Sequence, residues 1–361
     1  MLRLTLIRTA PPGAPGSMTA FADLVARALA LDPPPDVNIG ICDGFDPRAG
    51  DRMWPQHLWR LRRFGAALFR APADRYVLLD GSMAAFLPPA LLDRTFAYVH
   101  DLIPLLQLRG ELPGRPSPPA AWLVRRAVRR LSRCRSLAAN SRATGRDVER
   151  LLHRRVERIV PLALRELPPP DASALRDRPA RFLLHVGHNA PYKNRAGAIE
   201  VFRRLCGRAS DASAFRDLHL LLAGPPPTPE LRAFAAAVPR ARFLENVSDA
   251  ALAALYRDAA LLLFPSLCEG FGMPVLEAMS LGCPVVCADA PALLEVAGGA
   301  ALSAPARDPE ALAARCREVL RDPACRAQLC DAGRRRAGEF TLARMGRQLW
   351  DWLLDPREGA P

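Results

Sequence analysis

ALLLFPSLCEGFGMPVLEAMSLGCPVV, residues 260–286, contains a strand, a glycine turn, a helix and a second strand. The opening apolar run, Ala260–Phe264, is short and bounded by turn residues, which is typical of a buried parallel strand. Gly270 and Gly272 predict the turn, and Pro274 predicts the first position of a helix, where its missing N–H costs nothing. Such a unit presents backbone N–H groups and the positive end of a helix dipole, so it favours an anionic ligand.

Apolar runs alternate with segments of helical spacing along the rest of the chain. The expected strands are Leu2–Ile7, Val37–Cys42, Tyr76–Leu79, Phe96–Val99, Ser136–Ala139, Phe182–Val186, Leu218–Ala223, Ala260–Phe264 and Pro284–Cys287. The expected helices are Met18–Leu31, Ala120–Arg135, Asn194–Cys206, Asp249–Asp258, Pro274–Leu281 and Leu342–Leu354. Alternating β and α elements predict an α/β protein with doubly wound parallel sheets.

A break in this alternation divides the chain. Residues 166–180, ELPPPDASALRDRPA, are proline-rich, polar and aperiodic, as linkers are. We therefore expect one domain over 1–165 and another over 181–341, with a last helix at 342–356 that packs on a domain surface, the N-terminal domain being the candidate. Ligands of such sheets lie beyond the carboxyl ends of the strands, so a cleft between the domains is the default site.

The composition limits the class of protein. The 361 residues carry a formal net charge of +13, which favours an acidic partner unless it only reflects an arginine-rich composition. The nine cysteines form no Cys-x-x-Cys pair, so neither a disulfide framework nor a zinc site is expected. The sequence contains no run of about 18 uncharged apolar residues, so we expect no transmembrane helix, and a cytoplasmic location is the default.

Three side chains near the glycine turn carry candidate chemistry. Lys193 is the only lysine among fifty basic residues. Since an ammonium is a compact point charge and a guanidinium a planar fork, its retention favours a phosphate contact over survival by chance. Glu269 lies in the turn and Glu277 in the first turn of the following helix. A carboxylate can accept hydrogen bonds from two adjacent sugar hydroxyls, whereas a favourable interaction with the helix dipole is the simpler role for Glu277.

The block EGFGMPVLEAM, residues 269–279, resembles the signature of retaining GT-B glycosyltransferases of family 4. That signature has two glutamates separated by seven residues around a Gly-Phe-Gly turn. The resemblance covers most of the chain and extends to these segments: Gly282–Val286, Glu295–Gly299, Val247–Asp249 with Leu252 and Tyr256, Val186–Gly187, Lys193–Asn194, His100–Pro104 and Asn140–Ser141. It implies a GT-B architecture, in which two Rossmann-like domains face a cleft, the N-terminal one binding the acceptor and the C-terminal one the nucleotide-sugar donor.

The resemblance also implies roles for the matching residues. At the reacting centre, Glu269 would contact hydroxyls of the transferred sugar, Lys193 would neutralise the diphosphate, and His100 would contact the donor sugar. A helix-capping or solvated histidine is the alternative for His100. Glu277 would bind the ribose hydroxyls. The other expected donor-binding residues are Gly187, Asn194, Asn246, Val247, Gly270, Phe271 and Gly272.

Other positions match the family less well. Where an arginine usually precedes the lysine, this chain has Tyr192, and we expect Arg195 to supply the missing charge from the next turn. Gly13 and Gly16 match the family's first loop only approximately. The sequence contains no Asp-x-Asp pair, so we expect no metal and no cofactor beyond a GDP- or UDP-linked sugar donor.

These features predict a retaining, metal-independent hexosyltransferase that acts on a glycan or lipid-linked acceptor in cell-envelope polysaccharide synthesis. Mannose from GDP-mannose is the candidate donor sugar. The alternative is a non-catalytic GT-B scaffold that binds nucleotide sugars, because a phosphate contact is missing at Tyr192. Nucleic-acid binding is not expected, since neither an RNA-binding aromatic motif nor a helix-turn-helix occurs.

Two basic segments predict a surface feature. Residues 122–135, WLVRRAVRRLSRCR, form a basic amphipathic helix, and a second cluster contains Arg60, Arg62, Arg63 and Arg70. Such surfaces can bind anionic lipid at the inner face of the cytoplasmic membrane. The alternative is that the apolar face packs on the sheet and the arginines are only solvated.

Overall fold

The computed structural model describes residues 1–9, 17–45, 53–173, 175, 178–207 and 213–355. The chain forms two compact units, each built on a six-stranded sheet. The first unit contains residues 1–111, 115–163 and 340–361, and the second contains residues 112–114 and 164–339. All neighbouring strands are parallel, which confirms the predicted α/β class with two Rossmann-like sheets. The predicted limits of the domains and linker stay predictions.

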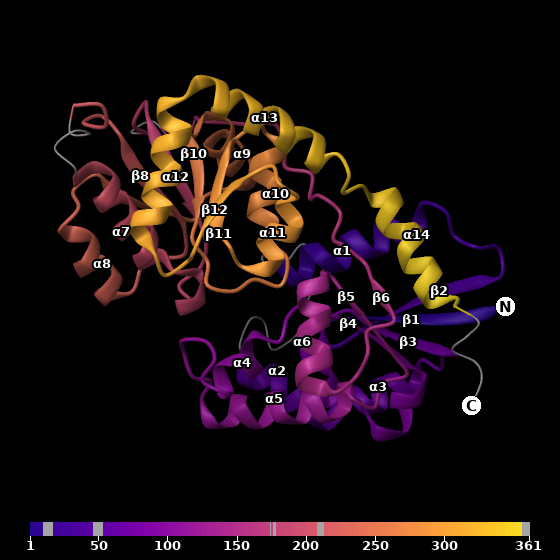
Figure 1. The fold of residues 1–361 in the computed structure, drawn as a ribbon. Helices are drawn as coiled ribbons and strands as arrows, with labels where there is room; N and C mark the ends of the chain where they lie inside the picture. The colour runs from indigo at the N-terminus through magenta and orange to yellow at the C-terminus, as the bar shows by residue number, and fades with distance from the viewer. Residues whose placement is uncertain (10–16, 46–52, 174, 176–177, 208–212, 356–361) are drawn as a thin grey trace. The chain divides into compact units, whose positions relative to one another are not determined.

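The first sheet has the strand order β2-β1-β3-β4-β5-β6 (Figure 1). Its strands are β1 Leu2–Arg8, β2 Val37–Asp43, β3 Arg75–Leu78, β4 Thr95–Val99, β5 Ser136–Ala139 and β6 Arg158–Ile159. Its α-helices are α1 Ser17–Ala30, α2 Met53–Trp59, α3 Gly65–Arg70, α4 Ile103–Leu108, α5 Pro118–Leu131, α6 Arg142–Leu152 and α14 Leu342–Leu353. Successive strand residues face opposite sides: Leu78 packs with α3, α5 and α6, whereas Val77 packs with α1 and α14.

Helix α14 belongs to the core of the first unit, although it follows the second unit in the sequence. Trp352 is 1% exposed, and its indole N–H donates a hydrogen bond of 2.8 Å to Ser136 Oγ. The same ring meets Phe96 edge-on with centroids 5.7 Å apart. Gly346 lets α14 approach α1, because a Cβ there would overlap the Ala28 carbonyl oxygen. The last helix therefore closes one face of the first sheet together with α1.

The second sheet has the order β12-β11-β10-β7-β8-β9 (Figure 1). Its strands are β7 Phe182–Val186, β8 His219–Gly224, β9 Ala241–Glu245, β10 Leu261–Phe264, β11 Val285–Ala288 and β12 Leu302–Ala304. Its α-helices are α7 Arg195–Gly207, α8 Pro229–Ala236, α9 Asp249–Asp258, α10 Met273–Ser280, α11 Pro291–Ala297, α12 Pro309–Arg321 and α13 Pro323–Ala337. Strand β7 is buried except at Val186, strand β10 is fully buried, and the two are adjacent, so the loops that follow them meet at one edge.

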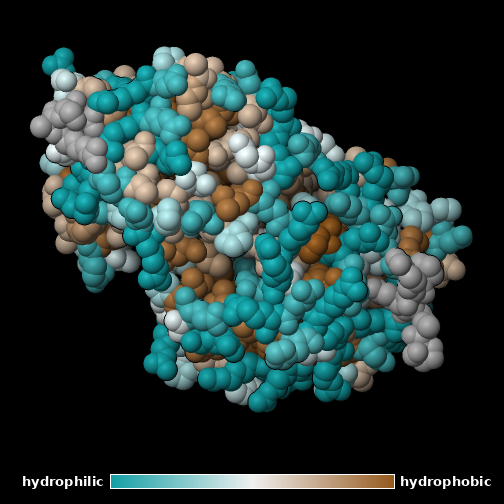
Figure 2. Space-filling view, viewed as in Figure 1, coloured by the Kyte–Doolittle hydropathy of each residue, from teal (hydrophilic) through white to brown (hydrophobic). Residues whose placement is uncertain are grey.

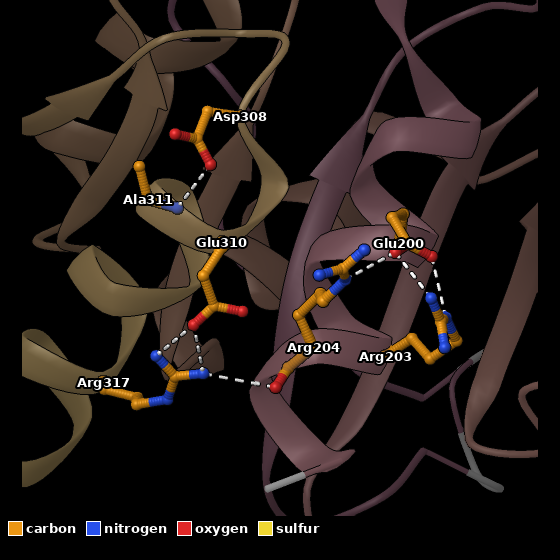
Figure 3. A network of polar contacts seen from close by, with 7 residues as sticks. All are labelled: Glu200, Arg203, Arg204, Asp308, Glu310, Ala311 and Arg317. Carbon is orange, nitrogen blue, oxygen red and sulfur yellow. Dashed lines mark hydrogen bonds and ion pairs between the residues drawn. The ribbon is translucent and has the colours of Figure 1, made fainter.

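Polar contacts join α7 to α12 in the second unit (Figure 3). Arg317 of α12 is 9% exposed; it donates to the Arg204 carbonyl oxygen of α7 and pairs with Glu310. On α7, Glu200 accepts hydrogen bonds from Arg203 and Arg204, and these contacts lower its pKa to about 2. Charged side chains thus pair with each other and with a backbone carbonyl at the edge of the contact between α7 and α12.

Three strands differ from the sequence prediction, which did not include them: β6, β9 and β12. Each lies at an edge of its sheet, and β6 and β12 contain only two and three residues. Strand β9, ARFLE, is partly exposed along its whole length. Edge strands pair on one side only, so these segments lack the continuous apolar run by which a buried strand is predicted.

Candidate functional site

The loops after β7 and β10 are joined at the carboxyl edge of the second sheet. The Leu267 N–H donates to the Tyr192 carbonyl oxygen at 2.7 Å, and Asn194 Nδ2 donates to the Pro265 carbonyl oxygen at 2.9 Å. Asn194 has a φ of 55°, in the left-handed region, and ends the 3₁₀ turn Pro191–Lys193. This conformation suits asparagine, whose side chain also accepts a hydrogen bond from the Gly197 N–H at 3.1 Å. The structure therefore brings the two predicted donor loops together.

Lys193 and Glu269 form an ion pair between these loops. Lys193 Nζ lies 2.8 Å from each carboxylate oxygen of Glu269. The two side chains are 13% and 7% exposed, so the pair is shielded from bulk water. Nζ also lies 5.7 Å from the ring centroid of Phe264, at the end of β10. The ammonium and the carboxylate thus hold each other at the sheet edge.

The glycine turn leads directly into α10, as predicted. Gly272 caps the helix with a φ of 108°, and a Cβ there would lie 2.6 Å from Leu293 Cδ2. The helix begins at Met273, so Pro274 occupies its second position rather than its first. Phe271 is only 5% exposed and packs into the unit. The turn therefore requires glycine at 272 for backbone conformation as well as for space.

Glu277 does not lie in the first turn of α10, and that prediction was wrong. It is the fifth residue of the helix and is 4% exposed. Its Oε1 accepts from Arg165 Nε at 2.9 Å, and its Oε2 accepts from the Tyr256 hydroxyl at 2.9 Å. Burial raises the pKa of this carboxyl, while Arg165 opposes the shift. Side-chain partners rather than the helix dipole therefore stabilise its charge.

The expected donor-binding residues Asn246 and Val247 precede α9. Asn246 is exposed with a φ of 55°, and Val247 is half-buried beside it. Ser248 caps α9, its hydroxyl accepting from the Ala251 N–H at 3.2 Å. Asp249 at the start of that helix accepts from Arg165 at 2.8 Å. Because Arg165 bonds Glu277 as well, this segment is tied to the predicted ribose carboxylate.

At Tyr192, where the family usually has an arginine, the side chain contacts His188. Tyr192 Oη lies 3.3 Å from His188 Nε2, and His188 Nδ1 accepts from the Ala190 N–H at 3.1 Å. Burial lowers the pKa of His188, and the charge of Lys193 lowers it further. Arg195 is 3% exposed and donates to the Pro225 carbonyl oxygen at 3.1 Å. Its guanidinium thus holds loops of the sheet edge together, which is not the surface position expected of a substitute cation.

Gly187 closes the β7 end of the site. Its N–H donates to the Ala223 carbonyl oxygen at 3.0 Å, and a Cβ at 187 would lie 3.2 Å from the buried His185 Nε2. Burial lowers the pKa of His185 to about 4, so this imidazole is neutral. A larger residue than glycine at 187 would therefore press on a rigid, uncharged side chain beneath the loop.

His100 lies in the first unit, directly after β4. Its Nε2 lies 2.8 Å from the Leu79 carbonyl oxygen and donates to it, and its ring contacts Phe21 edge-on at 4.2 Å between centroids. Burial lowers its pKa. The imidazole is therefore neutral and fixed by its neighbours. Gly13 and Gly16 lie outside the described residues.

Two features of the site were missed in the sequence. Arg165 contacts Glu277 across 112 positions of the chain, and no periodic pattern announces such a pair. Tyr256 is among the residues that carry the resemblance, but the hydrogen bond that its hydroxyl donates to Glu277 was not predicted. Its position on the buried side of α9, with Leu255, is the only sequence feature that indicates an inward-facing hydroxyl in need of an acceptor.

Two observations concern the predicted absence of a bound metal and of a transmembrane helix. Within the described ranges, no three His, Cys, Asp or Glu side chains come together as metal ligands would. Metal independence stays a prediction. Over the same part of the chain, no helix combines the length and the apolar character that crossing a bilayer requires.

Part of the second unit matches a known protein family. Residues 180–322 match the family described as Glycosyl transferases group 1. The O-antigen chain mannosyltransferase B of Escherichia coli is 41% identical over 100 residues, 28% of this chain and 26% of that protein. The alpha-D-kanosaminyltransferase of Streptomyces kanamyceticus is 28% identical over 316 residues, 81% of this chain and 80% of its own length. The chain spans about a quarter of the length of the first relatives that it matches.

Solved structures share the fold over the full chain. Sucrose-phosphate synthase from Thermosynechococcus elongatus has a TM-score of 0.75 at 19% identity, with 100% of both chains covered. Anabaena Alr3699/HepE in complex with UDP and glucose has a TM-score of 0.73 at 17% identity, covering 98% of this chain and 100% of that one. With the family match, this likeness confirms the predicted resemblance to GT-B glycosyltransferases and agrees with the prediction of an enzyme. Membership of family 4 stays a prediction.

Proposed function

We propose that this protein is a retaining, metal-independent glycosyltransferase that moves a hexose from a nucleotide sugar to a glycan or lipid-linked acceptor. One observation carries the proposal: Lys193 Nζ and Glu269 form a shielded pair at the carboxyl edge of β7 and β10, beside the N-terminus of α10. An ammonium, a carboxylate and oriented N–H groups are the groups that a nucleotide-sugar diphosphate and its sugar hydroxyls require.

The charges suit departure of a diphosphate. An ammonium has three N–H donors, and two serve the oxygens of Glu269, which leaves one for a phosphate oxygen. As the bond between the anomeric carbon and the diphosphate breaks, Lys193 and the helix start would stabilise the growing negative charge. The acceptor oxygen forms its bond on the same face, and its proton passes to the departing phosphate. Retention follows from this front-face attack.

Mannose is the proposed sugar, with cell-envelope polysaccharide as the proposed product. The support is the identity of 41% over 100 residues with an O-antigen chain mannosyltransferase. The binding of UDP by Anabaena Alr3699/HepE supports a nucleoside diphosphate as the leaving group of the same fold. GDP-mannose is therefore the first donor to test, and UDP-glucose is the second.

A panel of nucleotide sugars tests the proposal. Each is scored by the shift in unfolding temperature and by donor hydrolysis at high protein concentration, since a ligand of the folded state raises stability by mass action. The unmodified protein should be stabilised by one base and should release nucleoside diphosphate. Lys193→Met should weaken binding, while Arg315→Gln, which breaks an exposed pair on α12, should bind normally. Absence of any shift across the panel would contradict donor binding.

The same experiment separates the enzyme from the non-catalytic scaffold. The observation that favours the scaffold is the pairing of Tyr192 with His188 in place of an arginine at the lysine loop. A scaffold would give the thermal shift without hydrolysis or transfer. Release of diphosphate that depends on Glu269 would exclude it.

Contact with an anionic membrane is proposed for the basic face of the first unit. In α5, Trp122 is 50% exposed, Arg125 and Arg129 are also exposed, and no acidic residue occurs between Pro118 and Arg135. Figure 2 shows mainly hydrophilic residues along the lower edge of this unit, where α5 runs in Figure 1. Co-sedimentation with vesicles of anionic lipid should occur and should be lost in Arg125→Glu/Arg129→Glu. Equal binding to neutral vesicles would contradict an electrostatic contact.

A further inference from the structure

Arg165 contacts the buried carboxylate of Glu277 in the candidate donor site. Its Nε donates to Glu277 at 2.9 Å, and its NH1 donates to Asp249 at 2.8 Å. The Arg165 side chain is 27% exposed and that of Glu277 is 5% exposed. The long segment of the second unit, residues 164–339, begins at Leu164, so this arginine is the second residue of that segment. The start of the segment therefore contributes a cation to the site.

The geometry leaves acceptor capacity on Glu277. A carboxylate offers about four lone-pair directions. Arg165 uses one on Oε1, and Tyr256 uses one on Oε2. One direction on each oxygen is thus left, which is the number that two adjacent hydroxyls of a ribose need. Both remaining directions belong to a carboxylate whose orientation is set from two sides.

We propose that Arg165 is a positioning residue for the nucleotide: it keeps Glu277 ionised and turned so that the carboxylate accepts the two ribose hydroxyls. The inference rests on the proposed function, because it takes a nucleotide-sugar donor for granted. It adds a residue that lies outside the glycosyltransferase signature and outside the match at 180–322.

The charges around Glu277 explain why the cation is needed. Besides Arg165, the carboxylate faces the Tyr256 hydroxyl and the negative charge of Asp249, and the Cys283 thiol lies close to Tyr256. Burial raises the pKa of Glu277, and Asp249 adds to that rise; Arg165 is the group that lowers it most. Without Arg165, two carboxylates would face each other and the buried one would take a proton. A protonated carboxyl loses one acceptor direction and its charge, so it binds hydroxyls less well.

The bond to Asp249 fixes the guanidinium in place. Asp249 begins α9, and its carboxylate is 54% exposed. Arg165 therefore bridges the outer end of α9 and the buried middle of α10 with two differently placed N–H groups. A lysine at this position would supply charge as one point and could not serve both carboxylates in the same geometry.

The test uses nucleoside diphosphates that differ only in the ribose. Binding of GDP and UDP and of their 2′,3′-dideoxy forms is measured by calorimetry on the unmodified protein and on Arg165→Met and Arg165→Lys. For the base that binds, Arg165→Met should raise the dissociation constant by about tenfold to hundredfold, as expected for hydrogen bonds to a charged group. The dideoxy form should bind equally weakly to all three proteins, and Arg165→Lys should recover part of the loss.

The pH dependence supplies a second readout that a merely structural arginine would not change. Loss of Arg165 moves the protonation of Glu277 to higher pH, so binding of the ribose form to Arg165→Met should improve as the pH rises from 6 to 8.5 by more than in the unmodified protein. His188 titrates in both proteins and cancels in the comparison.

The matched control is Arg178→Met. Arg178 also joins the first segment of this unit to α9, through Asp258 at 2.6 Å, but it makes no contact with Glu277. It should bind the ribose form as the unmodified protein does. Equal weakening of ribose and dideoxy forms by Arg165→Met would overturn the inference. Failure of the unmodified protein to bind any nucleoside diphosphate would instead overturn the proposed function.

Discussion

The ion pair between Lys193 and Glu269 should contribute to the free energy of unfolding, and this contribution can be measured separately from donor binding. Lys193→Met removes the cation and leaves a carboxylate that is 7% exposed without its partner. Loss of one member of a buried pair costs roughly 3–5 kcal/mol. Because Lys193 is 13% exposed and water can reach the site in part, we expect about 3 kcal/mol, at the lower end of that range.

The size of the effect suits thermal and urea unfolding. For a unit of 150–250 residues, about 1 kcal/mol lowers the unfolding temperature by roughly 2–4 °C, so Lys193→Met should lower it by about 6–12 °C. Glu269→Gln should also destabilise, since it leaves the ammonium with a neutral amide. In the double variant Lys193→Met/Glu269→Gln neither of the two positions carries a charge. The stability of this variant should therefore return to within about 1 kcal/mol of the unmodified protein.

A double-mutant cycle tests whether Lys193 and Glu269 stabilise the fold through their ion pair. The coupling energy between the two positions should exceed about 2 kcal/mol in the absence of donor, because the loss in Lys193→Met alone exceeds the loss in the double variant by that amount and the loss in Glu269→Gln adds to it. Donor binding and diphosphate release should stay lost in the double variant, although its stability is restored. A coupling energy near zero would mean that the pair contributes nothing to folding. Full diphosphate release by the restored double variant would mean that neither residue serves the donor.

Three further substitutions test other parts of the structure by urea unfolding. Gly272→Ala should destabilise by about 1–2 kcal/mol or more, because its φ of 108° disfavours any side chain and the new Cβ would press on Leu293; unchanged stability would contradict the turn. Trp352→Ala should cost about 3–5 kcal/mol, and a loss below 1 kcal/mol would contradict the placement of α14 in the first core. Glu200→Gln should cost about 1 kcal/mol at pH 7, since Arg203 and Arg204 are half exposed and screened. Because the contact with Arg203 lowers the Glu200 pKa from 4.5 to about 2, its contribution is present above pH 4.5 and should vanish as the pH falls to 2; a difference that persists at pH 2 would contradict an ionic origin.

Much of the fold could be predicted because its central strands are short apolar runs with abrupt ends. Strands β7 and β10 are buried on both faces, and proline or glycine follows each within a few residues. A parallel strand covered on both faces can tolerate few polar residues, so its limits are visible in the sequence. The edge strands β6 and β12 have no such requirement, and pairing on one side is enough to form them.

The parts of the candidate site that are determined by local backbone conformation could be predicted from the sequence. The parts that are determined by contacts between residues far apart in the chain could not. The turn at Gly272 is determined within a few residues, since only glycine readily accepts its conformation. The position of Glu277 depends on where α10 begins, and a shift of the helix start to Met273 already moves that residue out of the first turn. Its partner Arg165 is the last residue of the predicted N-terminal domain, directly before the expected linker, and nothing in its sequence neighbourhood indicates a contact with Glu277.

Pairing of acids with cations explains how the loop before α10 and the middle of α10 can each hold a buried carboxylate. Glu269 and Glu277 stand eight positions apart, and each is almost fully buried. Two unpaired carboxylates so close to the protein interior would be costly to bury and would repel a diphosphate. Lys193 matches the first from the loop after β7, and Arg165 matches the second from the start of the unit. The two cations come from segments far from α10 in the sequence, so the site acquires its charge balance from the fold and not from the signature alone.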